Sequence, residues 1–457
     1  MVEDKFERIA SAPALALDKT IDTSKNIFEN TKDKLRFRKA REYWHILGPG
    51  LTTGASDDDP SGIGTYSQTG AQYGNQLLWL SWFTFPLMAV VQEMCARIAL
   101  STGRGLAGNI KHYYPRWVLY VCTILLFGAN TFNIGADLGA MAKASQLLFP
   151  NIGFTLLVVF FGVVSLGLQI FSTYQQYSRY LKWLALILIS YILSSLSIHG
   201  LNWGNILKSA VIPSISLSKP QIILICGILG TTISPYLFFW QTSQEVEEEI
   251  LQGKTTIESR SEPDKRSIKN MRIDVWSGML LSNLVMFFII VATSATLFTH
   301  GITNIATAAD AAKALKPLAG NAAYLLFALG IIGTGMLAIP VLAGSASYAM
   351  SESFGWDHGL NRTLKQASAF YGIIIISMLI GFVINFVGFD PIKALIYSAV
   401  LNGMVAPVIL VLIVIISSNR VIMGKNSNHP VTEFLGWVIT GIMVVAGIAT
   451  IWALLNP

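Results

Sequence analysis

The chain has 457 residues, of which 53% are hydrophobic and 13% charged, and its formal net charge is +6. Soluble domains carry about 25% charged residues, so this composition excludes an ordinary soluble protein and predicts a polytopic membrane protein. The basic residues lie in short loops between apolar segments, which does not favour a nucleic-acid partner. The three cysteines form no CxxC pair, and no nucleotide-binding, HExxH or nucleophile-elbow motif supports an enzyme or a bound cofactor. We expect the chain to lie in the lipid bilayer and to need no obligate protein partner.

Residues 1–44 are polar and of mixed charge, without the apolar run of a signal peptide. They predict a cytoplasmic tail, of which 18–41 is alternatively an amphipathic helix on the membrane surface. Residues 45–457 are predicted to form the transmembrane domain.

Eleven apolar segments follow the tail, each long enough to cross a bilayer. Lysine and arginine concentrate in the loops after the even-numbered segments, which predicts a cytoplasmic N-terminus and an extracytoplasmic C-terminus in the cell membrane. The segments lie near 46–72, 77–100, 118–147, 152–171, 181–198, 220–246, 274–299, 321–350, 368–388, 393–417 and 433–455.

Two segments, the first and the sixth, carry signals that break a helix. Pro60 follows three aspartates in the first, and Pro235 follows a glycine-rich stretch in the sixth. Unwound backbone at membrane depth is tolerated only where protein buries it or it lines a cavity. Breaks five segments apart indicate a five-plus-five inverted repeat of about 46–198 and 220–417, with 433–455 as an extra helix and the binding site near the midplane.

Three adjacent carboxylates at membrane depth are costly and therefore indicate a function; the alternative is that they lie in an exposed loop. Successive residues point in different directions, so Asp57, Asp58 and Asp59 cannot all converge on one ion. Asp59, at the break itself, is the predicted cation ligand, while Asp57 and Asp58 are predicted to line the access route.

At the sixth segment, unwinding frees the carbonyls of Thr231 and Thr232 and brings the hydroxyl of Ser234 near the break. An aspartate, hydroxyls and main-chain oxygens form a hard ligand set, which suits Mg²⁺, Ca²⁺ or Mn²⁺. Mg²⁺ keeps several waters and needs only one or two carboxylates, so a sparse site with small side chains fits it best.

Two further acidic positions allow two interpretations. Glu93 and Arg97 have the spacing of an ion pair within one helix, with a gate as the alternative. The glutamates from Glu245 to Glu249 are predicted to form a solvated helix end, with a cation-attracting vestibule as the alternative.

The stretches GPGLTTGASDDDPSGIGTYSQTGAQYGNQLLW, ARIALSTGRGLA, GTTISPYLFFWQTS and SSNRVIMG resemble the NRAMP family of divalent metal transporters over nearly the whole chain. The resemblance implies an all-α, LeuT-like fold with broken helices 1 and 6 and a cation site between them.

Several ligand positions depart from the family pattern. The aspartate of the first motif is retained as Asp59, but its asparagine is replaced by Gly62. The Met-Pro-His motif reads Ser234-Pro235-Tyr236, so the soft sulfur ligand and a histidine associated with proton handling are both replaced. The remaining differences are Gln241 for a second histidine, Asn133 with a displaced Asp137 for the Asp-x-x-Glu proton route, and Ala399 for a glutamine, with Asn402 one turn beyond.

These departures resemble the divergent NRAMP-related magnesium transporters. We therefore predict an importer of partly hydrated Mg²⁺, with Mn²⁺ tolerated as a substrate and without proton coupling. Asp59 anchors the ion, carbonyls of Ser56 and Thr231 complete its shell, and Ser234 and Asn402 make second-tier contacts. The alternatives are a proton-coupled Mn²⁺ or Fe²⁺ importer and a Na⁺-coupled amino-acid or organic-solute symporter.

Overall fold

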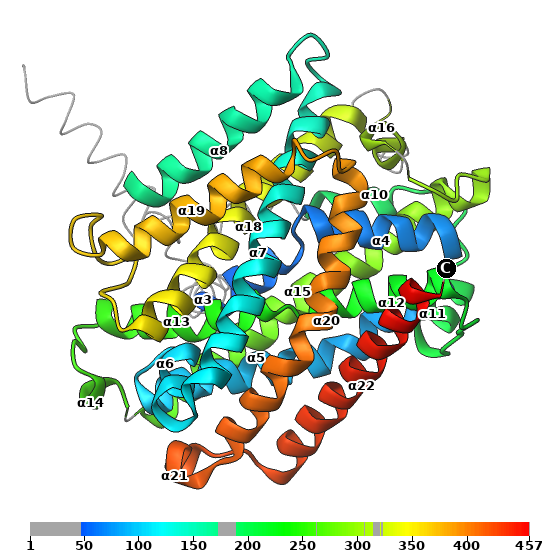
Figure 1. Cartoon of the computed structure of the whole chain (residues 1–457). Coiled ribbons are helices and arrows are strands. Elements are labelled where there is room, and N and C mark those ends of the chain that lie inside the picture. Colours follow the sequence, from blue (N-terminus) through cyan, green and yellow to red (C-terminus); the bar gives the residue numbers. More distant parts are fainter. Residues whose placement is uncertain are drawn as a thin grey trace, which may run out of the picture. The chain divides into compact units, whose positions relative to one another are not determined.

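The computed structural model describes residues 47–171, 189–261, 263–305, 307–313, 320 and 323–456, and within these ranges the regular structure is helical (Figure 1). Residues 48–457 cluster into one compact unit. The predicted tail 1–44 and residues 181–188 of the predicted segment 181–198 lie outside the described residues. The helices up to the sixth segment are α3 (Pro49–Asp57), α4 (Pro60–Tyr73), α5 (Trp79–Thr102), α6 (Leu106–Tyr113), α7 (Arg116–Gln146), α8 (Phe154–Phe171), α10 (Ile189–Leu196), α11 (Trp203–Val211), α12 (Lys219–Thr232) and α13 (Pro235–Leu251). The later helices are α14 (Ile257–Arg260), α15 (Lys265–Thr296), η2 (Phe298–His300), α16 (Ala308–Ala312), α18 (Ala323–Phe354), α19 (Ser368–Ile384), α20 (Pro391–Ser418), α21 (Arg420–Met423), η5 (Gly424–Asn426) and α22 (Pro430–Leu455).

Ten of the eleven predicted transmembrane segments overlap described helices or helix pairs along most of their length, and 181–198 overlaps only the short helix α10. Among the described residues, eight helical stretches are long and apolar enough to cross a bilayer, the pair α12–α13 counting as one, and α19 is a shorter apolar helix. The helices α3 and α4 occupy the first predicted segment. The all-α membrane architecture is therefore confirmed.

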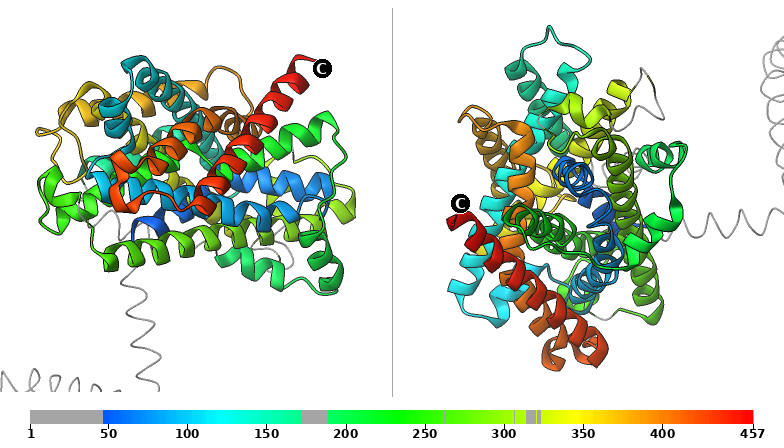
Figure 2. Two further views of the ribbon diagram at one scale, coloured as in Figure 1. Left: turned by 90° about the horizontal axis from the view of Figure 1, so that it is seen from below. Right: turned by 90° about the vertical axis from the view of Figure 1, so that its right-hand side faces the viewer.

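The broken helices lie in the middle of the bundle. The helix α15 packs against α3 and α4, and α5 packs against α13, so each broken helix contacts an unbroken helix from the other half of the chain. The helix α7 packs against α18 and α20. The C-terminal helix α22 packs on α12 and α20 and lies at the outside of the bundle (Figure 2).

The contact between α3 and α15 is a backbone contact made by glycines. A Cβ added to Gly50 would lie 2.5 Å from the Val275 nitrogen, and a Cβ added to Gly54 would lie 2.3 Å from the Gly278 carbonyl carbon. Small residues four apart allow two helices to approach this closely in a membrane. The short helix α3 therefore lies directly on α15.

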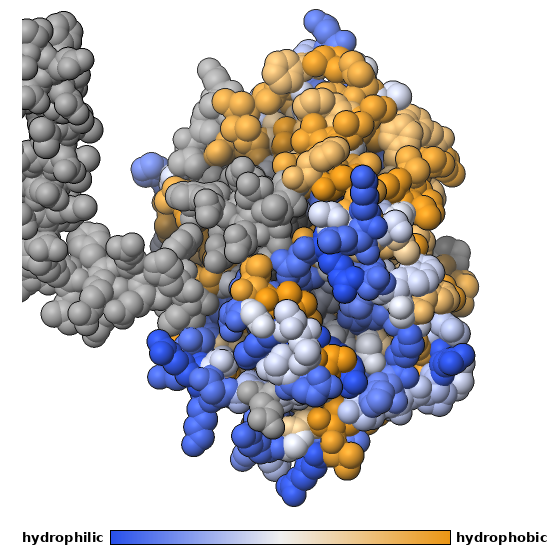
Figure 3. Space-filling model, turned by 90° about the vertical axis from the view of Figure 1, so that its left-hand side faces the viewer, coloured by the Kyte–Doolittle hydropathy of each residue, from blue (hydrophilic) through white to orange (hydrophobic). Residues whose placement is uncertain are grey.

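Large apolar side chains remain exposed on the peripheral helices, for example Leu156 and Val163 on α8 and Val445 and Ile448 on α22. Figure 3, viewed from the left-hand side of Figure 1, shows hydrophobic residues in the upper part of that face and hydrophilic residues in the lower part. Exposed apolar flanks are what lipid contact requires, because lipid tails are as apolar as leucine side chains.

Candidate functional site

The first segment is broken at its aspartates, as predicted. The helix α3 ends at Asp57, and Asp58 adopts φ −85° and ψ 48°. Asp59 is extended, with φ −65° and ψ 172°, and it caps the N-terminus of α4, which begins with Pro60. Proline suits the first position of a helix because its missing N–H would have no partner there.

The sixth segment is broken in the same way. The helix α12 ends at Thr232, Ile233 leaves the helical region with φ −123° and ψ 57°, and Ser234 precedes Pro235 at the start of α13. Both predicted breaks are therefore present.

Asp59 is buried and accepts hydrogen bonds on both carboxylate oxygens. Its Oδ1 accepts from the Gly62 nitrogen at 2.6 Å and from the Ser61 hydroxyl at 2.8 Å. Its Oδ2 accepts from the Asn133 side chain of α7 at 2.8 Å. Asn133 in turn accepts at Oδ1 from the Asn402 Nδ2 of α20 at 3.4 Å. The first break is thereby joined to α7 and α20.

The two breaks contact each other directly. The Tyr236 hydroxyl donates to the Ser56 carbonyl at 2.9 Å, and the Thr231 hydroxyl donates to the Asp57 carbonyl at 3.4 Å. A Cβ on Gly62 would lie 2.9 Å from the Thr231 hydroxyl oxygen and 3.0 Å from the Asp57 carbonyl oxygen. The structure thus brings the predicted residues Ser56, Asp59 and Thr231 to one place.

Ser234 also lies at the second break, but its hydroxyl points back to its own segment. It donates to the Gly230 carbonyl at 2.6 Å and to the Thr231 carbonyl at 2.8 Å. The main-chain oxygen of Thr231, which is a predicted ligand, therefore accepts a hydrogen bond from the Ser234 hydroxyl.

Asp57 and Asp58 are fully buried, so the alternative of an exposed loop is wrong. The Ser282 hydroxyl of α15 donates to Asp57 Oδ2 at 2.6 Å, which turns Asp57 toward α15 while Asp59 faces α7. Within the described residues, no three His, Cys, Asp or Glu side chains form a group able to hold a metal. That the three aspartates do not converge on one ion stays a prediction.

Glu245, Glu247 and Glu249 of α13 are buried and Glu248 is partly exposed, so the prediction of a solvated helix end is wrong. Glu245 accepts from the Gln241 side chain at 2.9 Å, and Glu247 accepts from the Tyr348 hydroxyl at 2.6 Å and from the Leu360 nitrogen at 2.9 Å. Glu247 thus ties α13 to the connection between α18 and α19.

In place of the predicted ion pair within α5, Glu93 and Arg97 contact residues from distant parts of the chain. Glu93 pairs with Arg272 of α15 at 2.8 Å and accepts from the Trp276 indole at 2.8 Å, while Arg97 donates to the Asn428 side chain at 2.5 Å. Helical spacing alone does not reveal such partners from other helices.

Asp274, which the sequence analysis did not identify, holds the start of α3. Its carboxylate accepts from the main-chain nitrogens of Gly48 and Gly50 at 2.7 Å each and from that of Leu51 at 3.0 Å. The first N–H groups of a helix have no partner within it and favour a negative charge, so Asp274 fastens α3 to α15.

The structure alone gives their roles to three residues at the breaks, Asn133, Tyr236 and Ser282, and to Asp274 at the start of α3. Asn133 and Tyr236 had been noted only as departures from the family pattern. The available signal was a polar group inside an apolar segment, since such groups usually face the bundle interior.

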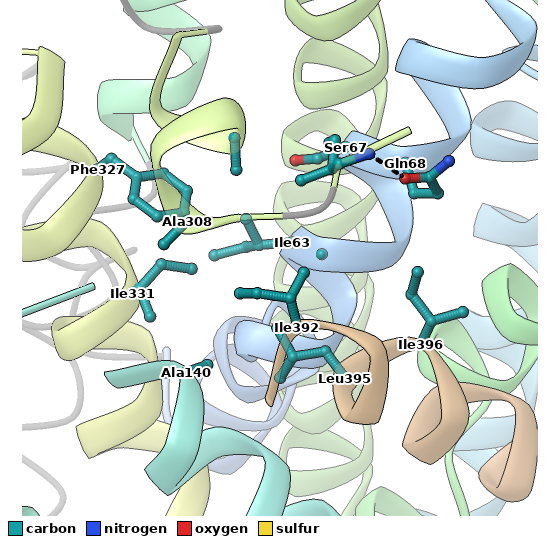
Figure 4. Close-up of a pocket in the computed structure, with 13 residues that line it drawn as sticks. Ile63, Ser67, Gln68, Ala140, Ala308, Phe327, Ile331, Ile392, Leu395 and Ile396 are labelled. Carbon is teal, nitrogen blue, oxygen red and sulfur yellow. Dashed lines mark hydrogen bonds between the residues drawn. The ribbon is translucent and has the colours of Figure 1, made fainter. Parts of the chain in front are cut away.

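Beyond the break, α4 borders an apolar pocket. Ile63 of α4, Leu395 of α20 and Phe327 of α18 line it, as Figure 4 shows. Gln68 closes one side, because its Nε2 donates to the Thr303 carbonyl at 3.1 Å and its Oε1 accepts from the Ile305 nitrogen at 2.9 Å.

The chain matches known proteins in sequence over most of its length. Residues 50–453 match the family model described as "Natural resistance-associated macrophage protein-like", Nramp. The divalent metal cation transporter MntH of Deinococcus radiodurans is 25% identical over 439 residues, covering 92% of each chain. The MntH of Klebsiella pneumoniae strain 342 is 26% identical over 411 residues, covering 87% of this chain and 92% of the relative.

Solved structures share the fold. A manganese transporter of Eremococcus coleocola, solved with an aromatic bis-isothiourea compound, superposes with a TM-score of 0.69 at 18% identity, covering 89% of this chain and 86% of that chain. Mhp1, a transporter of the nucleobase-cation-symport-1 family, superposes with a TM-score of 0.51 at 13% identity, covering 89% and 91%.

Proposed function

The chain belongs to the Nramp family and is a membrane transporter of divalent metal cations, and from this premise we propose that its favoured cargo is partly hydrated Mg²⁺, imported without proton coupling. Mn²⁺ is tolerated as a substrate. A symporter of amino acids or organic solutes does not fit this family, because the family transports divalent metal cations. The metal is the transported substrate and not a cofactor.

In this proposal Asp59 anchors the ion. The carbonyls of Ser56 and Thr231 contact it directly or through water, and Ser234 and Asn402 make second-tier contacts. The access route is lined by Asp57 and Asp58, with Glu245 nearer the end of α13.

The contact of the Tyr236 hydroxyl with the Ser56 carbonyl carries the proposal. The Tyr236 hydroxyl donates to this carbonyl in the way that a water molecule bound to a hydrated cation would donate to it. The Thr231 carbonyl accepts the Ser234 hydroxyl in the same manner. These partners are hard oxygens at positions where the family pattern has a thioether and an imidazole, which favours an ion that retains its water.

Import without a coupled proton is energetically feasible. Each positive charge gains about 2.3 kcal/mol on crossing 100 mV toward the negative side, so a divalent ion gains about 4.6 kcal/mol. The proposed orientation places the N-terminus in the cytoplasm and the C-terminus outside, with 46–198 and 220–417 as inverted repeats and the last helix outside them.

Uptake by the purified chain in liposomes tests the proposal. We expect entry of Mg²⁺ and Mn²⁺ driven by an inside-negative potential, no acidification reported by an internal pH dye, and loss of uptake in Asp59→Ala. Metal-coupled proton entry, or Mn²⁺ uptake without Mg²⁺ uptake, contradicts the proposal.

A proton-coupled Mn²⁺ or Fe²⁺ importer is the second candidate, and one contact favours it. A Cβ on Gly335 would lie 2.4 Å from the Met141 sulfur and 3.3 Å from the Pro60 ring, so a thioether lies beside the first break. Soft sulfur ligands favour transition metals. Uptake by Met141→Leu separates the candidates: a selective loss of Mn²⁺ transport supports the second, and unchanged transport of both Mn²⁺ and Mg²⁺ supports the first.

A further inference from the structure

The side-chain amide of Asn133 joins two carboxylates from different helices. Its Nδ2 donates to Asp59 Oδ2 at 2.8 Å and to Asp137 Oδ2 at 3.0 Å. Asn133 and Asp137 are four residues apart and so lie on the same face of α7. One nitrogen therefore holds the anchoring carboxylate of the first break beside a second carboxylate.

Oxygen atoms with unused capacity surround this pair. Asp137 Oδ1 and Asn402 Oδ1 are buried and have no hydrogen-bond partner among the described residues. The Asp137 side chain is 0% exposed and that of Asn402 is 1% exposed. A buried acceptor without a donor is costly, and a cation or its bound water removes that cost.

When both carboxylates are ionised, the described residues do not compensate their charge. No ion pair between described residues includes Asp59 or Asp137. The Asn133 amide is neutral, so it orients the two carboxylates without cancelling their repulsion in a medium of low dielectric constant. A divalent cation would supply the missing charge, since Mg²⁺ is usually bound through one or two carboxylates while it keeps several waters.

We propose that Asp137 is a second carboxylate of the cation site, opposite Asp59 across Asn133, and that the amide oxygen of Asn402 completes this side of the site. Asn133 is a positioning residue that holds both carboxylates. This inference rests on the transport function proposed above and assigns to Asp137 a contact with the hydrated ion.

The test measures concentration dependence of uptake in liposomes for the parent chain and for Asp137→Asn, Asp137→Glu and Asn133→Ala, with MgCl2 and with MnCl2. The matched control is Glu433→Gln, which makes the same carboxylate-to-amide change in the first turn of α22. We expect Asp137→Asn to raise KM by about 10- to 100-fold with a smaller change in maximal rate, as loss of a metal-site contact does. Asp137→Glu keeps the charge and should recover much of the affinity, and Asn133→Ala should also raise KM.

Calorimetric titration of the purified full chain with MgCl2 gives a readout independent of transport, and size-exclusion profiles identify variants that do not fold. Parental KM and parental Mg²⁺ affinity in a folded Asp137→Asn overturn the proposal, as does a variant that loses only a response to pH. If the parent carries Mn²⁺ and not Mg²⁺, the proposed cargo fails, whereas the effect of Asp137→Asn on Mn²⁺ KM still decides the role of Asp137.

Discussion

The break between α3 and α4 and the break between α12 and α13 share a backbone design but differ in their surroundings. Each has an extended residue followed by proline at the start of the second half-helix. The first break carries three buried carboxylates and depends on α7 and α15 for partners. The second carries hydroxyls, and Ser234 satisfies carbonyls of its own segment.

The difference indicates a division of roles between the breaks. Charge and outside partners make the first break sensitive to its neighbours and attractive to a cation. The second break is neutral: Ser234 donates to carbonyls of its own segment, and the Thr231 and Tyr236 hydroxyls donate to carbonyls of the first break. Four predictions probe this comparison.

The largest effect is expected for the charge at the first break. Asp59→Asn keeps the size of the side chain but removes the negative charge, so we expect uptake to fall by at least about 100-fold. Initial rates of Mg²⁺ and Mn²⁺ entry into liposomes measure this. Uptake within a few-fold of the parent would mean that the first break is not the anchor.

The anchor of α3 is the next target. Asp274→Ala removes a carboxylate that accepts three main-chain N–H groups, and hydrogen bonds to a charged group contribute about 1.5–3 kcal/mol. We expect a lower unfolding temperature in detergent and faster labelling of a cysteine placed at Thr52. The control is Asp357→Ala, which removes an exposed aspartate. Equal unfolding temperatures and equal labelling rates in the two variants would refute the anchoring role of Asp274.

The tight contact between the breaks predicts a smaller loss. Gly62→Ala places a methyl group 2.9 Å from the Thr231 hydroxyl oxygen, and overpacking costs about 1–3 kcal/mol. Because Thr231→Ala removes that oxygen, the double variant should be more stable than the sum of the single effects predicts. Purely additive unfolding temperatures would show that the two residues do not compete for space.

The smallest effect is expected at the second break. Ser234→Ala removes a hydroxyl that bonds to its own segment, and an ordinary hydrogen bond contributes about 0.5–1.5 kcal/mol, so we expect less than a tenfold change in uptake. Uptake kinetics measured beside Asp59→Asn provide the comparison. A loss as large as that of Asp59→Asn would remove the proposed division of roles.

The sequence was sufficient to locate both breaks, because proline and glycine act through the backbone at their own positions. It also predicted the order of the apolar helices from hydrophobicity alone. Contacts between distant helices were not accessible in this way. The pairing of Glu93 with Arg272, the burial of Glu247 and the bridge made by Asn133 depend on which helices meet and at what height.

The site followed the same pattern. The residue types at Asp59 and Thr231 indicated hard oxygen ligands, but their present hydrogen-bond partners come from the packing of α7 and α13. Periodicity contains no information on these partners. The sequence therefore shows Asn133 only as a departure from the family pattern, although its amide donates to the carboxylate that we propose as the anchor.

The fastening of α3 to α15 has a mechanical consequence. Glycine backbones in contact and a carboxylate across the helix start leave little freedom for α3 to swing alone. A movement that displaces α3 must either break those hydrogen bonds or move α3 and α15 together as one rigid unit. In the second case the backbone between α3 and α4 would bend at Asp58, which already lies outside the helical conformation.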